Sequence, residues 1–128
     1  MTLAHLIPQL PQFAPLQQAL DRVRDGKTAI FDDLPDAARA ALIAATASEL
    51  ERPIVLVTAR RDRADALASA ISEYLQPGSD VFLWPAADAM PFEQLPIDLD
   101  ASVRRVQQLA TLRSRRANVI VTPVSGLM

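Results

Sequence analysis

One short triplet contains residue types that bind phosphate. Gly26, Lys27 and Thr28 match the end of the phosphate-binding loop of nucleotide-binding proteins. That loop also has an earlier glycine, which would fall where Asp21 stands, and it follows a strand and leads into a helix. Here the triplet precedes an expected strand, so we interpret it as a turn that leads into that strand.

The position where a phosphate loop is expected is acidic instead. The apolar segment 28–31 is predicted to be a strand, and the residues after it are Asp32, Asp33, Leu34, Pro35 and Asp36. This stretch has no glycine and no lysine, and its three carboxylates would repel phosphate. We predict a degenerate phosphate loop whose acids cap the next helix, with no catalytic, cofactor-binding or metal-binding residue.

Two groups of arginines are candidates for anion or DNA contacts. Arg60, Arg61 and Arg63 follow the second expected strand, at the sheet edge where open α/β folds bind ligands. Asp62 and Asp65 are interleaved with them, which favours local ion pairs and at most weak anion or DNA contacts. The second group is predicted to form an exposed helix surface near a helix C-terminus. Its members are Arg104, Arg105, Arg113, Arg115 and Arg116.

The remaining candidates have structural explanations. Tyr74, Trp84 and Phe92 could stack on bases, but such platforms normally line a basic groove, so we interpret them as core or loop anchors. The single His5 lies among prolines with no nearby nucleophile, so neither a histidine-based metal centre nor a catalytic triad is expected.

Composition narrows the class of protein further. The chain has 128 residues, 50% of them hydrophobic, a formal net charge of −2 and no cysteine. These values are typical of one globular domain with a packed core, and they exclude disulfide scaffolds and thiolate sites. No apolar run is long enough for a membrane span, and no signal peptide is recognisable, so we expect a cytoplasmic protein without a membrane partner.

The hydrophobic pattern alternates strands and helices. We predict strands at 28–31, 54–58, 81–84 and 119–122 and helices at 16–24, at 62–75 and at about 100–113. A further helix, with Pro35 in its first turn, is predicted to run to about Leu50. The unbroken apolar run at 54–58 indicates a parallel strand covered on both faces. Three prolines keep residues 1–15 out of any long helix and favour an arm. The fold class is therefore α/β, a three-layer sandwich with a mainly parallel sheet of about four strands and helices on both faces.

Residues 16–128 resemble a known family through collinear segments. The chain resembles the N-terminal region of bacterial transcription-repair coupling factor and, more distantly, the first domain of UvrB. The segments that carry the resemblance are Pro53–Thr58, Ile71–Leu75, Val81–Pro85, Ala89–Glu93, Ser102–Val106 and Asn118–Met128. Two stretches depart from the family pattern: Met90-Pro91-Phe92-Glu93 stands where the family has leucine-proline-tyrosine-acid, and 95–98 lacks a histidine.

The resemblance implies an incomplete UvrB-like α/β domain after the proline-rich arm 1–15, with P-loop-NTPase-like topology and a decayed nucleotide site. The parent would be an ATP-dependent DNA translocase that displaces stalled RNA polymerase and recruits UvrA in nucleotide excision repair. ATP, magnesium and DNA would be bound by a motor further along the chain. The loop 85–98 corresponds to the DNA-gripping hairpin of UvrB, but it is shorter and poor in aromatics.

Two other functions are compatible with the residues. The first is a free-standing nucleotide-binding or phosphate-binding α/β enzyme that uses the arginines at 60, 61 and 63. The second is a DNA-binding domain, which the slightly acidic net charge of the chain disfavours.

Overall fold

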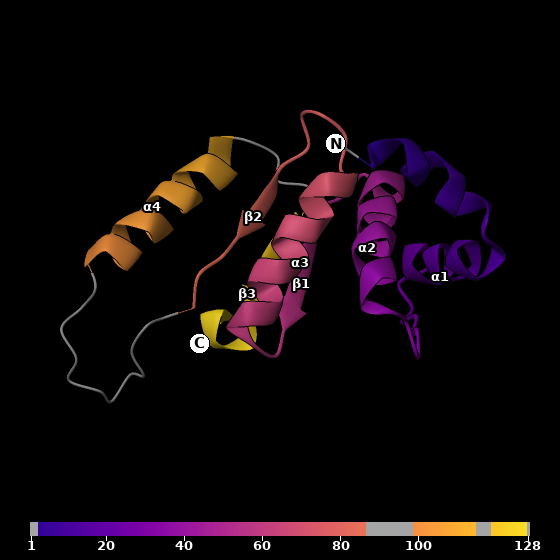
Figure 1. Ribbon diagram of the computed structural model, residues 1–128, viewed down its shortest axis with the longest axis horizontal. Helices are drawn as coiled ribbons and strands as arrows, with labels where there is room; N and C mark the ends of the chain where they lie inside the picture. Colours follow the sequence, from indigo (N-terminus) through magenta and orange to yellow (C-terminus); the bar gives the residue numbers. More distant parts are fainter. Residues whose placement is uncertain (1–2, 87–98, 115–118, 128) are drawn as a thin grey trace. The chain divides into compact units, whose positions relative to one another are not determined.

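The computed structural model describes residues 3–86, 99–114 and 119–127. Contacts between residues divide the chain into two compact units. The first comprises Met1–Arg52 and Ser69–Ser79 and is helical, whereas the second comprises Pro53–Ala68 and Asp80–Met128 and contains the sheet (Figure 1).

The first unit begins with a 3-10 helix, η1, at Ala4–Gln12. The prolines were predicted to keep residues 1–15 out of any long helix, but the segment is helical: Pro8 and Pro11 lie inside a 3-10 helix of nine residues, and Pro15 lies in the first turn of the helix that follows. Ile7 is buried, and the backbone N–H of Leu3 donates to the carbonyl of Glu73 at 2.7 Å. The proline-rich arm is therefore attached to the unit.

The next helix, α1, spans Ala14–Arg24 and has a proline in its first turn. The N–H that proline lacks would have no hydrogen-bond partner within the helix at that position, so the helix loses no bond. Leu16 and Leu20, spaced by four, lie on its buried face. This helix agrees with the prediction for residues 16–24, apart from an earlier start.

The alanine-rich helix α2 spans Asp36–Leu50. Its end agrees with the prediction, but Pro35, which was predicted to lie in the first turn, is the N-cap residue just before the helix. Its alanines at 40, 44 and 47 recur along one face and are buried. They allow close approach of neighbouring backbone, and the neighbours of α2 within this unit are η1 and α1. The helix ends at Leu50, and the next residue, Glu51, adopts the left-handed conformation with φ 50°.

The second unit contains three parallel strands in the order β1-β3-β2. Their bounds are Ile54–Thr58 for β1, Val81–Leu83 for β2 and Val119–Pro123 for β3. In the register, Val119 pairs with both Ile54 and Val81. Val119 and Val121 of the central strand have no exposed surface, so β3 forms the core of the sheet.

The prediction that β1 is covered on both faces is wrong. Val55 and Val57 are 57% and 47% exposed. The strand lies at one edge of the described sheet, and its side chains alternate between a covered and an open face. A run of β-branched residues does not distinguish a central strand from an edge strand.

The strand predicted at 28–31 is also not found. This segment carries no strand in the structure, and Ile30 is 80% exposed. The carbonyl of Thr28 accepts a hydrogen bond at 3.1 Å from Nε of Arg22. A segment of four residues is too short to form a strand unless a neighbouring strand pairs with it.

Two further α-helices and a short 3-10 helix complete the described fold. Helix α3 spans Arg61–Tyr74, and α4 spans Leu99–Ser114, both within a residue of the prediction. A short 3-10 helix, η2, follows β3 at Val124–Leu127. No helix in the described ranges is both long and apolar enough to cross a membrane.

Val121→Ala tests the central position of β3. The substitution removes buried methyl groups, so we expect the free energy of unfolding to fall by about 2 kcal/mol. Val55→Ala, on the open face of β1, should change it by less than about 0.5 kcal/mol. Urea denaturation followed by circular dichroism measures both, and equal losses would contradict the assignment of the two positions.

Candidate functional site

The acidic loop before α2 is the first candidate site. Asp32, Asp33, Pro35 and Asp36 are exposed and Leu34 is half-buried. Asp33 has φ 52°, a left-handed conformation that aspartate tolerates better than most residues. Pro35 precedes the helix and provides no side-chain cap. The acids of this loop were predicted to cap α2. The N-cap position is instead occupied by Pro35, and no side chain makes a capping hydrogen bond there.

The first turn of α2 is occupied by an ion pair. Nη1 of Arg39 lies 3.3 Å from Oδ1 of Asp36, and Nε of Arg39 donates to the carbonyl of Leu34 at 3.2 Å. A carboxylate at this end interacts favourably with the positive pole of the helix, which is the position where a phosphate would bind. The loop thus presents a carboxylate at the N-terminal end of α2, which is the end of a helix that attracts anions.

The Gly26-Lys27-Thr28 triplet ends a helix. The N–H of Gly26 donates to the carbonyl of Val23 at 3.0 Å, and the N–H of Lys27 donates to that of Arg22 at 2.8 Å. With Gly26 at φ 73°, these are the two bonds of a Schellman motif. The predicted turn is confirmed, although no strand follows it, and Nζ of Lys27 lies 3.7 Å from Oδ2 of Asp25.

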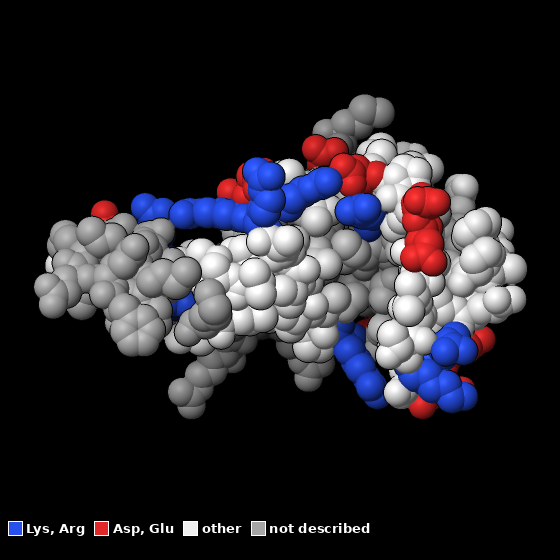
Figure 2. All heavy atoms as spheres, turned by 90° about the horizontal axis from the view of Figure 1, so that it is seen from below, with Lys and Arg blue, Asp and Glu red and all other residues white. Residues whose placement is uncertain are grey.

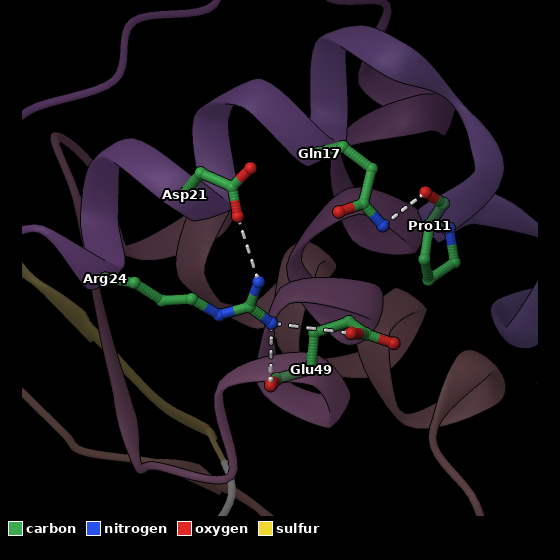
Figure 3. Close-up of polar contacts among 5 residues, drawn as sticks. All are labelled: Pro11, Gln17, Asp21, Arg24 and Glu49. Carbon is green, nitrogen blue, oxygen red and sulfur yellow. Dashed lines mark hydrogen bonds and ion pairs between the residues drawn. The ribbon is translucent and has the colours of Figure 1, made fainter.

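Arg24 joins two helices of the first unit. Its Nη1 lies 3.2 Å from Oδ1 of Asp21 on α1, and its Nη2 lies 3.6 Å from Oε2 and 3.5 Å from the carbonyl of Glu49 on α2 (Figure 3). Gln17 of α1 donates to the carbonyl of Pro11 at 2.5 Å in the same region. These contacts give the basic end of α1 a structural role.

The arginines after β1 are held by neighbouring acids. Nε and Nη2 of Arg60 donate to the two carboxylate oxygens of Asp62 at 3.0 and 2.9 Å. The predicted local ion pair is confirmed for Arg60, and Arg61 and Arg63 also make interactions. Basic and acidic side chains stand next to one another on the face seen in Figure 2. Anion contacts by these arginines remain a prediction.

A cluster that the sequence did not indicate lies at the carboxyl ends of β2 and β3. Nε1 of Trp84 donates to the carbonyl of Gly126 at 3.2 Å, and Nη2 of Arg105 donates to the same carbonyl at 3.4 Å. The guanidinium carbon of Arg105 is 5.4 Å from the centroid of the Trp84 ring, within the range of a cation–π interaction. Nε2 of Gln108 donates to the carbonyl of Leu83 at 3.0 Å.

This cluster changes the interpretation of α4. Arg104 is exposed, as predicted for the basic surface, but Arg105 is half-buried and faces Trp84. The only sign of this contact in the sequence is its composition, which combines a single tryptophan with many arginines. The side chain of Arg113 and residues 115 and 116 lie outside the described parts.

The predicted aromatic anchors are only partly described. Trp84 is half-buried and hydrogen-bonded in the second unit, as an anchor should be, whereas Tyr74 belongs to the first unit. Phe92 and most of the loop 85–98 fall outside the described residues. His5 is exposed on η1, and no three potential metal-ligating side chains lie together within the described ranges.

Comparisons of the chain with protein-family models, with curated proteins and with solved structures found no match.

Gly126→Ala tests the packing of this cluster. A Cβ at position 126 would clash with Oγ1 of Thr122 and lie 3.2 Å from the carbonyl oxygen of Pro85. We expect the free energy of unfolding to fall by about 1 to 3 kcal/mol, because a packed site has no room for another methyl group. Thermal or urea denaturation measures the loss, with Ser125→Ala as the neighbouring control.

The clash with Thr122 can be isolated by a double-mutant cycle. Adding Thr122→Ala to Gly126→Ala removes the nearest atom, so the pair should be coupled by about 1 kcal/mol. Simple additivity of the two losses would contradict the close contact.

Proposed function

We propose that this chain is the non-catalytic N-terminal, UvrB-like module of a bacterial transcription-repair coupling factor. The collinear resemblance over residues 16–128 is the basis of the proposal. The mixed α/β fold with a parallel sheet is compatible with it, because the resemblance places parallel strands at 54–58, 81–85 and 119–122.

The single observation that carries the non-catalytic part is the acidic loop at 32–36. A nucleotide-binding domain presents backbone N–H groups and a lysine to the phosphates at the start of a helix. At the start of α2 this chain presents Asp36 paired with Arg39, with two further carboxylates just before it. We infer that the module binds no ATP and needs no cofactor of its own.

The parent protein supplies the activity in this proposal. It is an ATP-dependent DNA translocase that displaces RNA polymerase stalled at damage and recruits UvrA, working in the cytoplasm. ATP, magnesium and DNA belong to its motor, and the present module contacts the rest of the same chain. The finer fold is part of the proposal: a P-loop-NTPase-like sheet of about four strands with helices on both faces.

The alternative, a free-standing phosphate-binding enzyme that uses Arg60, Arg61 and Arg63, has no specific observation in its favour. The guanidinium of Arg60 already makes a two-bond contact with Asp62.

Strand-specific repair in the source organism tests the proposal. Disruption of the gene should abolish the faster repair of ultraviolet lesions in the transcribed strand, leaving both strands repaired at the slower rate. The measurement is lesion frequency in each strand of an induced gene over time, with the intact gene restored on a plasmid as the control. Faster repair of the transcribed strand that persists after disruption would overturn the assignment.

A further inference from the structure

Two apolar surfaces within the second unit are exposed. One is a stripe on α4, whose side chains are 51% to 74% exposed and recur at helical spacing. The stripe consists of Leu99, Val103, Val106 and Leu109. The other is the open face of the sheet, where Val55 and Val57 of β1 are exposed. Both surfaces would lose their contact with water if they packed on each other.

The open face is apolar across all three strands. Val55 of β1 pairs with Ile120 of β3, which pairs in turn with Phe82 of β2. Residues paired in register point to the same face of a sheet, so these three side chains form one apolar row. Ile120 and Phe82 are only half-buried, whereas Val119 and Val121, which alternate with Ile120, are buried on the opposite face. The open face therefore has the apolar character of a surface that a helix covers.

The path of the chain assigns α4 to this open face. The chain runs from β1 through α3 to β2, and it returns from β2 through α4 to β3, which lies between the other two strands. Connections between parallel strands are right-handed in nearly all proteins, and these two run in opposite directions along the sheet, so they belong on opposite faces. Ala64 of α3 has no exposed surface, as expected for the helix on the covered face.

In the structure, α4 does not lie over the sheet. Figure 1 shows α4 beyond β2, on the side of β2 away from β1. Nη2 of Arg105 donates to the carbonyl of Gly126, and Nε2 of Gln108 donates to the carbonyl of Leu83. In the described parts of the chain, Nε of Arg105 and Oε1 of Gln108 are buried without a hydrogen-bond partner. The contact that holds α4 is therefore polar and carries an unfavourable desolvation cost.

We propose that α4 has two positions. In the first, seen in Figure 1, Arg105 and Gln108 hold the helix beside β2. In the second, the helix turns about its axis and packs its apolar stripe on the open face of the sheet. The change gives up these hydrogen bonds and the contact of Arg105 with Trp84, but it returns two buried polar atoms to water and buries apolar surface on both elements.

Opposing terms of this kind keep two packings of one sequence close in free energy. The helix thus acts as a flap that covers or uncovers one face of the sheet. This proposal does not depend on the proposed function.

Cysteine crosslinking tests the second position, because the chain has no cysteine of its own. In the intact chain, Val55→Cys and Val106→Cys place one thiol on the open face and one in the stripe. Both valines are exposed, so the fold should be retained, which circular dichroism checks. We expect a short bismaleimide to join the two thiols within one molecule, which mass spectrometry identifies as a crosslinked monomer.

The matched control combines Val55→Cys with Arg104→Cys. Arg104 is exposed on the other side of α4 from the stripe, so this pair should react about tenfold more slowly. Arg105→Ala removes contacts that hold the first position and should speed crosslinking of the stripe pair by about threefold or more. Trp84 is the only tryptophan, so its fluorescence emission should shift on crosslinking as the Arg105 contact is lost.

Four results would overturn the proposal. They are equal rates for the stripe pair and the control pair, no reaction of the stripe pair, an emission of Trp84 that crosslinking leaves unchanged, and crosslinks that form only between two molecules. The last result would mean that a second copy of the chain covers the stripe.

Discussion

The two parallel ladders of β3 are the interaction on which the sheet depends. The strand pairs with β1 on one side and with β2 on the other, and its residues Val119 and Val121 are fully buried. Parallel pairing brings the carboxyl ends of all three strands to one edge, where open α/β proteins bind their ligands. What occupies that edge therefore decides what this unit can do.

Here the chain's own groups fill much of that edge. The carbonyl of Gly126, just after β3, accepts hydrogen bonds from both Trp84 and Arg105, and Arg60 after β1 is engaged by Asp62. In the other unit, the start of α2 carries an ion pair where an anion would otherwise fit. In the described parts of the chain, the three places that the sequence offered to an anion thus contain hydrogen bonds or ion pairs between the chain's own groups.

Periodicity was sufficient to predict the helices and three of the strands, because apolar spacing directly reflects which face is buried. It could not predict the exposure of Val55, which depends on whether another element covers that face of the sheet, or the irregular course of residues 28–31, which depends on whether a neighbouring strand pairs with them. The inward position of Arg105 was missed for a related reason. A lone tryptophan and a glycine carbonyl more than twenty residues away in sequence are brought to it only by the fold.

The most direct test of the central claim is equilibrium binding of ATP with magnesium to the intact chain, followed by calorimetry and by the thermal midpoint. The account predicts no heat beyond dilution and no rise in the midpoint, because a ligand stabilises a protein only if it binds the native state. Micromolar binding that is lost on changing the residues at the start of α2 would contradict it.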